Sequence, residues 1–422
     1  MTASTYHRVT RLAMMTAVHR AFYWLHLHQP QMRQWLLDAV RIPAPPFGES
    51  ARAAWFLDQF RTLGLGNVHR DEEGNVLGEV ASEGQSDSPV VLVSAHLDTV
   101  FPAGTPCDPI ESSDSSRIRG AGVCDNAAGL SALLGLVAAI RFANINPPAT
   151  ILFAANVGEE GEGDLRGMRH LFTAGRYKGR ITAAIALEGG GTATAVTNGL
   201  GSLRQRITLT GPGGHSWADA GAPNPILLLS SALHAIAEMP LSVEPLMTLN
   251  VGHISGGTSV NSIPSSATAL IELRSTGARE IENAAAEISR ILHATIAPFT
   301  GLTSPVGLQI ELIGRRPAAC LPAGSQLLHT LVAVDRHLRI PTEQRLGSTD
   351  ANLPLSLGVP ALAIGTGGTG GNIHTLDEWY DPAGRETALR RVLLLILACS
   401  QIVPQLVQET AASTEAAVHS TP

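Results

Sequence analysis

The feature that most constrains the fold is an apolar run that ends in two ionisable residues. Val90–Val93 are four consecutive aliphatic residues, and such a run is typical of a strand buried on both faces, as in a parallel sheet. His96 and Asp98 follow two positions apart, so in extended backbone both point to the same side. Open α/β sheets bind ligands at the carboxyl ends of their strands. The run predicts an α/β fold with these residues at a ligand-binding edge, while an ordinary surface pair remains the alternative.

Composition narrows the class of protein. The 422 residues allow two or three domains, and 15% charged residues leave enough apolar sequence for a large core. A net charge of −7 argues against nucleic-acid or acidic-membrane partners. Four cysteines without a C-x-x-C motif indicate neither a disulfide framework nor a thiolate zinc site, so we expect a cytoplasmic protein. No apolar run reaches the ~18 residues of a membrane span, and Leu12–Val18 is too short for a signal peptide.

The order of elements predicts one α/β domain interrupted by another. Strands are expected at 68–80, 90–93, 149–155, 181–187 and 361–364, and helices at 17–40, 50–63, 127–142, 325–338 and 385–407. Between them, strands at 203–209, 246–254, 266–273 and 307–312 and helices at 223–238 and 278–297 follow the order β-α-β-β-α-β. That order is the split arrangement of a ferredoxin-like module. We therefore expect a catalytic domain at 1–200 and 313–408, an inserted domain at 201–312, and a disordered tail at 409–422.

Ionisable residues recur where the predicted parallel strands end. Besides His96, they are Asp125 at the start of the first crossover helix, Glu159-Glu160, Glu188 and His374. Each has an ordinary explanation as a helix cap, a solvated turn or a surface histidine. Together they would converge on one edge of the sheet. Two histidines and three carboxylates suit Zn²⁺ and related divalent ions. Five protein ligands exceed one open tetrahedral site and favour two metals about 3.5–4 Å apart.

Six short motifs carry a resemblance that covers nearly the whole chain. They are His96-Leu97-Asp98, Gly122-Val123-Cys124-Asp125-Asn126, Glu159-Glu160, Glu188, Gly213-Gly214-His215-Ser216 and His374-Thr375. In this order they resemble the di-zinc family of tripeptide aminopeptidase (peptidase T), glutamate carboxypeptidase, acetylornithine deacetylase and succinyl-diaminopimelate desuccinylase. The resemblance implies a zinc-exopeptidase-like, mostly parallel sheet flanked by helices, with an inserted lid and dimerisation domain.

The resemblance also assigns roles to the metal-site residues. His96, Asp125 and Glu188 would hold one metal and His374, Asp125 and Glu160 the other, with Asp125 bridging. Asp98 would accept the second ring N–H of His96 and so fix its tautomer. Glu159 would be the general base that takes the proton of a hydroxide-forming water between the metals and passes it to the leaving amine.

Three further residues are implied by the resemblance in the inserted domain and just after it. His215 would reach the active site of a partner subunit and stabilise the oxyanion, which implies a homodimer through the lid. Asn261 would approach the substrate from the lid, and Arg316 would suit a substrate carboxylate. The loops at 347–350 and 365–371 would belong to the substrate pocket.

Other activities are poorly supported. Gly365–Gly370 fits G-x-G-x-x-G, but no apolar helix follows it, as a dinucleotide site requires. No G-x-S-x-G elbow of a serine hydrolase is found around Ser216, and Cys124 has no orienting histidine nearby in the sequence. A catalytically silent relative is a rival from another class, although Asp98, Asp125, Glu159 and Glu160 are all retained.

The sequence therefore predicts a metal-dependent hydrolase of the amide bond of a small peptide. Its cofactors would be two divalent ions, Zn²⁺ first and Co²⁺ or Mn²⁺ as alternatives. The loops at 43–49, 347–352 and 365–374 favour a peptidase T-like aminopeptidase. N-acyl-amino-acid deacylase or carboxypeptidase activity is the alternative, which Glu188 keeps open because peptidase T-like members are expected to carry Asp there.

Overall fold

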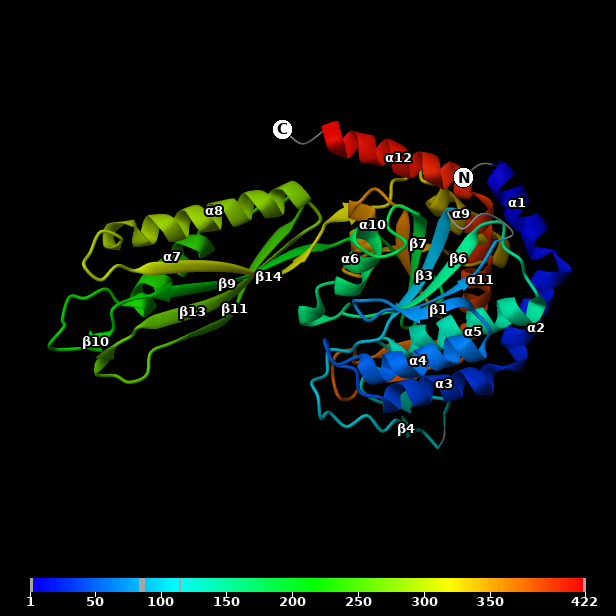
Figure 1. Ribbon diagram of the computed structural model, residues 1–422, viewed down its shortest axis with the longest axis horizontal. Coiled ribbons are helices and arrows are strands. Elements are labelled where there is room, and N and C mark those ends of the chain that lie inside the picture. The colour runs from blue at the N-terminus through cyan, green and yellow to red at the C-terminus, as the bar shows by residue number, and fades with distance from the viewer. Residues whose placement is uncertain (1–2, 83–87, 114, 420–422) are drawn as a thin grey trace. The chain divides into compact units, whose positions relative to one another are not determined.

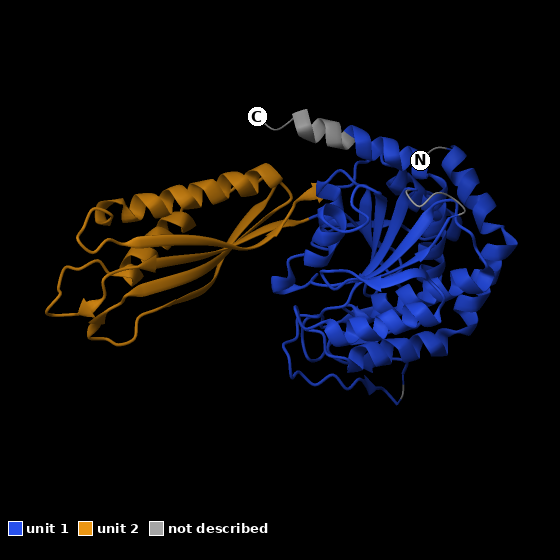
Figure 2. Cartoon of the chain, in the orientation of Figure 1, with its two compact units in different colours: residues 1–199, 320–422 blue, residues 200–319 orange. Residues whose placement is uncertain are grey.

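The computed structural model describes residues 3–82, 88–113 and 115–419, which form two compact units (Figure 2). Unit 1 consists of Met1–Gly199 and Cys320–Pro422, and unit 2 of Leu200–Ala319. The second unit is thus an insertion in the chain of the first. The sequence placed the end of the insertion at residue 312, but the last strand of unit 2 continues to Arg316.

Unit 1 is built on a mixed sheet of nine strands (Figure 1). The strand order is β1-β2-β6-β3-β7-β17-β8-β15, and β16 pairs with β8. The strands are β1 Gly66–Arg70, β2 Val76–Val80, β3 Val90–His96, β6 Thr150–Asn156, β7 Ile181–Glu188, β8 Thr194–Gly199, β15 Ala319–Cys320, β16 Glu343–Gly347 and β17 Ala361–Gly365. The central strands β6, β3, β7 and β17 are parallel, which confirms the predicted mostly parallel sheet.

The central strands form because their residues are apolar on both faces. Every residue of β3 and β6 is buried, as expected for strands covered by helices on both sides. Their register pairs His96 with Asn156, and β17 pairs Gly365 with Glu188 of β7. The carboxyl ends of β6, β3, β7 and β17 therefore meet along one edge of the sheet, where the candidate site lies.

Helices flank this sheet on both sides (Figure 1). They are α1 Ala3–Ala13, α2 Thr16–Leu27, α3 Gln29–Arg41, α4 Ser50–Thr62, α5 Ala127–Ala143, α6 Arg166–Thr173, α9 Gln326–Leu338, α10 Asn352–Ser356, α11 Arg385–Gln401 and α12 Val403–His419, with a 3₁₀ turn at Gly161–Gly163. The apolar helix α5 is buried almost throughout and packs against β3 and β7. Asn126 precedes its first residue and caps it, because the Asn126 side chain accepts a hydrogen bond from Gly129 N–H, so the helix cap is Asn126 and not Asp125.

A small antiparallel sheet joins two loops of the site. Its order is β18-β19-β5-β4, and its strands are β4 Ile110–Glu111, β5 Ile118–Arg119, β18 Thr369–Gly371 and β19 Trp379–Asp381. The hairpin of β18 and β19 carries His374, while β5 leads into the loop of Asp125. Pairing of β19 with β5 ties these two loops together although they lie about 250 residues apart in sequence.

Unit 2 has the ferredoxin-like arrangement that the sequence predicts. Its sheet has the order β11-β13-β9-β14 and is antiparallel throughout. Its elements are β9 Gly201–Thr210, β10 Gly214–His215, α7 Pro225–Ala237, β11 Met247–Gly256, β12 Ser262–Ile263, β13 Ser266–Ser275, α8 Ala278–Ile296, a 3₁₀ turn at Ala297–Phe299 and β14 Gly307–Arg316. Alternate residues of β13 are buried and pack with Leu229 of α7 and Ile288 of α8 in one apolar cluster.

Three local predictions differ from the structure. The helix expected over 17–40 is two helices, because Pro30 begins a new one in the first turn of α3. The strand expected over 68–80 is a hairpin, because the Asp71 carboxylate accepts the N–H groups of residues 73–75 and closes a turn. The tail at 409–422 was expected to be disordered, but residues 409–419 belong to α12, where the Glu409 carboxylate accepts hydrogen bonds from Gln326 N–H and the Ser325 hydroxyl. Residues 420–422 lie outside the described residues.

Within the described residues, no single helix has the length and apolar character of a membrane span. The bent pair formed by α11 and the first part of α12, with an angle of 75° between them, meets these criteria of length and composition only when the two are taken together.

Candidate metal centre and active site

Five ionisable side chains that lie far apart in sequence meet at the carboxyl edge of the unit 1 sheet. His96 ends β3, Glu188 ends β7, and Glu160 follows β6. Asp125 precedes α5, and His374 lies in the β18–β19 hairpin with φ of 67°. A non-glycine residue in this left-handed region costs about 1–3 kcal/mol and is typical of functional sites. The structure thus brings together all five residues that the sequence assigned as metal ligands.

The five side chains form two groups that share Asp125. In the first group, His96 Nε2 lies 3.1 Å from Asp125 Oδ1 and 3.7 Å from Glu188 Oε2. In the second, His374 Nε2 lies 3.2 Å from Asp125 Oδ2 and 3.0 Å from Glu160 Oε1. Within each group, the possible ligand atoms all lie within 4.8 Å of one another. Asp125 therefore directs a different carboxylate oxygen to each group.

These distances fit two coordination shells. Zinc bonds of about 2.0–2.1 Å in tetrahedral geometry place neighbouring ligand atoms about 3.3–3.5 Å apart. The nitrogen-to-oxygen distances of 3.0–3.7 Å bracket that spacing. Imidazole nitrogens and carboxylate oxygens are suitable ligands for zinc and related divalent ions. The donor set can hold two such ions, each with three protein ligands.

The pKa shifts of the two histidines indicate that the surrounding carboxylates stabilise positive charge at the site. Hydrogen bonds to Asp125 and Glu160 raise the pKa of His374 to about 10. Burial alone would lower the pKa of His96, but the neighbouring carboxylates of Asp125, Asp98 and Glu188 raise it well above its usual value. Burial raises the pKa of Glu188. Protons on the imidazoles thus provide charge that divalent ions would replace on binding.

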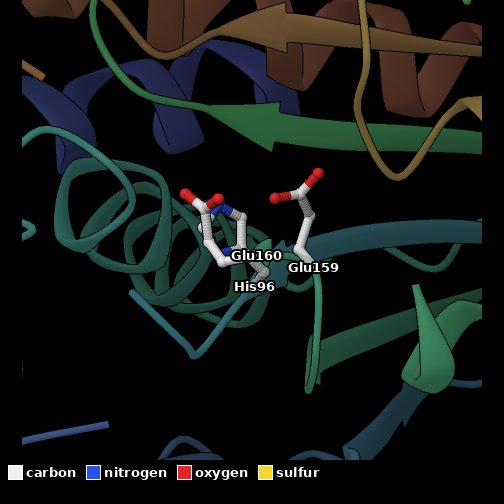
Figure 3. Close-up of side chains that lie close together, drawn as sticks. All are labelled: His96, Glu159 and Glu160. Carbon is white, nitrogen blue, oxygen red and sulfur yellow. The ribbon is translucent and has the colours of Figure 1, made fainter. Parts of the chain in front are cut away.

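Glu159 lies in the same loop as Glu160 but directs its side chain differently (Figure 3). It is buried, with 5% of its surface exposed. Ligand atoms of Glu159, His96 and Glu160 also lie within 4.8 Å of one another. A carboxylate in this position, outside both three-ligand groups, is suited to accept a proton beside the metal centre.

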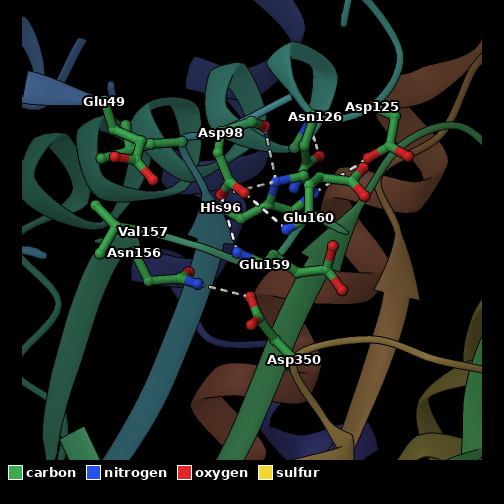
Figure 4. Close-up of polar contacts among 12 residues, drawn as sticks. Glu49, His96, Asp98, Asp125, Asn126, Asn156, Val157, Glu159, Glu160 and Asp350 are labelled. Carbon is green, nitrogen blue, oxygen red and sulfur yellow. Dashed lines mark hydrogen bonds and ion pairs between the residues drawn. The ribbon is translucent and has the colours of Figure 1, made fainter. Parts of the chain in front are cut away.

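Asp98 supports the site in a way the sequence did not predict (Figure 4). Its carboxylate lies 3.7 Å from His96 Nδ1, beyond hydrogen-bond range. The ring N–H of His96 instead donates to the backbone carbonyl of Asp98 at 3.0 Å, which still leaves Nε2 available as a ligand. The Asp98 carboxylate accepts the backbone N–H groups of Glu159 and Glu160 at 3.0 and 2.7 Å. Spacing alone could indicate which side Asp98 faces but not which partners it finds there.

Two buried residues that sequence analysis did not identify hold the site loops. The Glu378 carboxylate accepts hydrogen bonds from the N–H groups of Gly122, Cys124 and Asp125 at 3.2, 2.8 and 2.9 Å. Burial raises the pKa of Glu378 to about 7. Its position four residues after His374 in the sequence is a weak signal that it belongs to the site.

Asn75 fixes the start of the Glu159 loop from the β1–β2 turn. Its Oδ1 accepts a hydrogen bond from Val157 N–H at 3.0 Å, and its Nδ2 donates to the Asp71 carboxylate and to the Gly167 carbonyl. Gly167 N–H in turn donates to the Val157 carbonyl at 3.0 Å. No pattern in the sequence links residue 75 to residue 157.

The predicted pocket loops of unit 1 contribute in different ways. Asp350 is buried, accepts a hydrogen bond from Asn156 Nδ2 at 2.7 Å (Figure 4), and has its pKa raised to about 7 by burial. Residues 365–371 run from β17 into β18 without starting a helix, as expected if they do not form a dinucleotide site. Cys124 is buried, and burial raises the pKa of its thiol to about 12, so it is not an activated nucleophile.

The remaining predicted residues lie in unit 2. His215 is exposed in β10, where its Nδ1 accepts hydrogen bonds from Trp217 N–H and Ala218 N–H at 3.1 and 3.3 Å. A neutral His215 must therefore carry its proton on Nε2. Asn261 is exposed and accepts Ser216 N–H at its carbonyl. Arg316 is buried at the end of β14.

Fold and site together define an α/β protein with an inserted ferredoxin-like unit and a histidine–carboxylate centre able to hold two divalent ions. Residues 92–398 match Peptidase family M20/M25/M40. Because this match covers more than half of the chain, the chain belongs to that family, and the resemblance found in the sequence is confirmed.

Individual relatives agree with this assignment. The uncharacterized protein YqjE of Bacillus subtilis is 23% identical over 368 residues, which are 83% of this chain and 94% of the relative. A probable carboxypeptidase of Aspergillus flavus is 28% identical over 222 residues, 48% of this chain and 52% of that protein. The crystal structure of a tripeptidase from Staphylococcus aureus has a TM-score of 0.71 at 21% identity, covering 88% of this chain and 98% of that one. The last comparison shows a shared fold.

Proposed function

We propose that the chain hydrolyses the amide bond of a small peptide with the help of two divalent metal ions, Zn²⁺ first and Co²⁺ or Mn²⁺ as substitutes. The observation that carries the proposal is Asp125, which offers one carboxylate oxygen to His96 and the other to His374. One ion would be held by His96, Asp125 and Glu188. The other would be held by Asp125, Glu160 and His374.

Glu159 is the proposed general base. When bound, the two ions would polarise the scissile carbonyl and lower the pKa of a shared water toward ~7. Glu159 accepts the proton of the attacking water and passes it to the departing amine. Asp98 fixes this base by accepting its backbone N–H. The same carboxylate holds the N–H of Glu160, so base and ligand keep their relative positions.

His215 is the proposed oxyanion donor. Two backbone N–H groups occupy its Nδ1, so the neutral ring presents an Nε2–H donor, as stabilisation of a tetrahedral oxyanion requires. We propose that it acts in the active site of a second copy of the chain, in a homodimer formed through unit 2. Asn261 and Arg316 are proposed substrate contacts.

Aminopeptidase action on short peptides is the first choice of reaction. The likeness in fold to a tripeptidase supports it. The relative described as a probable carboxypeptidase favours the second candidate, cleavage at the other end of the peptide. N-acyl-amino-acid deacylation uses the same chemistry. All three reactions use the proposed Glu159 mechanism, and they differ only in the chemical groups on either side of the amide bond.

A substrate panel with metal removal tests the proposal. Dipeptides, tripeptides and N-acetyl amino acids are incubated with chelator-treated protein before and after addition of Zn²⁺, Co²⁺ or Mn²⁺. We expect activity only with metal, and a fall of about 10²–10⁴ in kcat for Glu159→Gln with metal content unchanged. Glu162→Gln, in the same loop but exposed, is the matched control. Near wild-type turnover of Glu159→Gln would overturn the mechanism, and metal-loaded protein without activity on any substrate would favour a silent relative.

A further inference from the structure

A small cavity opens directly beside two of the proposed metal ligands. Its volume is about 180 Å³, and its lining includes Asp125 and Glu188. The rest of the wall is mostly apolar and includes Val196, Ile364 and Ile373. All lining residues belong to unit 1. The mechanism described above uses none of these apolar residues.

The cavity lies where the parallel strands β7 and β17 end and the antiparallel strand β8 begins. Glu188 closes β7, and Val196 and Ile364 lie on the paired strands β8 and β17. Ile373, 45% exposed, comes from the β18–β19 hairpin next to His374. Gly365 admits no side chain here, because a Cβ would lie 2.4 Å from the Gly191 carbonyl oxygen. Glycine at position 365 allows its backbone to lie close to Gly191 and adds no side chain that would fill the cavity.

The size and lining of the cavity indicate what it can accept. An aliphatic cavity of about 150 Å³ is large enough to bind benzene. A cavity of about 180 Å³ therefore suits one side chain such as leucine, methionine or phenylalanine, whereas an indole is too large. Among the described lining residues there is no lysine, arginine or histidine that could pair with a substrate carboxylate. The cavity thus favours a neutral, apolar group of medium size.

We propose that this cavity is the specificity pocket for the side chain next to the scissile bond. The proposal rests on the proposed function, because a carbonyl held at the metal ligands places its adjoining side chain within reach of a cavity that these ligands line. The substrate class is then peptides or acylated amino acids with a medium-sized aliphatic or phenyl group at that position. Val196 and Ile373 are the specificity-determining residues.

A side-chain series measures this preference in the metal-loaded wild-type protein. X-Gly-Gly and N-acetyl-X-Gly substrates, in both of which X supplies the carbonyl of the bond to glycine, are compared with X as Gly, Ala, Val, Leu, Phe, Trp or Glu. Burial of apolar carbon raises kcat/KM about fourfold per methylene, so Leu should exceed Ala by about 50-fold, with a fall at Trp and Glu. If kcat/KM does not depend on the size of X, the proposal that this cavity is the specificity pocket is wrong, but the proposed function is unaffected. If no substrate is hydrolysed, the proposed function fails and the pocket with it.

Variants of Val196 test the assignment of the wall. Val196→Phe should lower kcat/KM at least tenfold for Leu and Phe substrates while changing the Ala substrate less than twofold. Val196→Ala adds no bulk that could disturb folding, and it enlarges the cavity. It should therefore shift the side chain X with the highest kcat/KM toward Trp. Val68→Phe, at a half-buried valine of β1 at the other end of the sheet, is the control and should leave the profile unchanged. An equal loss on all substrates for Val196→Phe, or an unshifted optimum for Val196→Ala, overturns the proposal.

Discussion

Glu159 in unit 1 is the proposed general base and His215 in unit 2 is the proposed oxyanion donor, and the two lie in loops that are held in different ways. Glu159 and Glu160 are buried, and their loop is fixed by residues from other parts of the unit, including Asp98 after β3 and Asn75 from the β1–β2 turn. The His215 loop is exposed and is held by its own neighbours. Asp219 accepts His215 N–H at 2.7 Å, and the carbonyl of Asn261 accepts Ser216 N–H.

The difference supports a site in which the Glu159 loop is complete within unit 1, whereas His215 acts together with a second copy of the chain. Bonds from separate elements fix the Glu159 loop before substrate arrives, and such preorganisation is needed for proton transfer over a defined geometry. The His215 loop has an ordered backbone, but next to it Trp217 is 87% exposed. Tryptophan is enriched at protein–protein interfaces relative to the rest of the protein surface. This contrast supports the proposal that His215 works against a second copy of the chain.

The largest expected effect concerns Asp125, because it belongs to both ligand groups. Asp125→Ala removes one oxygen ligand from each, so we expect both metals to be lost and activity to fall below detection. Metal content by atomic absorption and turnover on the best substrate check this. Asp58→Ala, at an exposed carboxylate of α4, is the control. A variant that retains one metal per chain would show that the two groups are independent and that Asp125 does not bridge.

The fold was predictable where burial is continuous in sequence. The runs at β3, β6 and β7 are buried on both faces, and their hydrophobic pattern was sufficient to identify them. Thr194–Gly199 forms β8 although it has no such pattern. The strands of the small sheet are two or three residues long, which is too short for any periodicity. Their formation depends on tertiary pairing.

The candidate site shows the same limit. The five ligand residues were found because polar groups at the ends of apolar strands are conspicuous in a sequence. The supporting contacts were not found, because they depend on which backbone groups lie nearby in space. Glu378 accepts three N–H groups from a loop some 250 residues earlier. The resemblance assigned the Asp98 carboxylate to the ring of His96, yet this carboxylate accepts the backbone N–H groups of Glu159 and Glu160.

A smaller effect is expected at His215, and it tests the contrast between the two loops. His215→Ala should lower kcat by about 10²–10³, the usual cost of removing one oxyanion donor, with metal content unchanged because the five proposed ligands all lie in unit 1. His293→Ala, exposed on α8, should have no effect. If the two proposed copies cooperate, mixing His215→Ala with Glu159→Gln protein should restore part of the activity through mixed dimers. A loss of metal in His215→Ala would contradict a purely chemical role.

The smallest effect is a release of protons when metal binds. The pKa of His374 is about 10 and that of His96 is raised well above its usual value, so in the metal-free protein both imidazoles are protonated at pH 7. Because the pKa of His374 is raised to about 10 in the fold, its protonated pairs with Asp125 and Glu160 stabilise the metal-free protein fully below the unfolded value near 6.5, and this contribution is lost as pH rises through about 10.

Metal must displace these protons, so its affinity should weaken as pH falls, and binding of two ions at pH 7 should release about two protons. Calorimetric titration with Zn²⁺ in two buffers of different ionisation enthalpy measures this number. His374→Gln should reduce it to about one, whereas His170→Ala, at a histidine beside Glu72 outside both ligand groups, should leave it unchanged. Binding without proton release would mean that the carboxylates bind metal without the two histidines, and the division of the site into two groups around Asp125 would have to be abandoned.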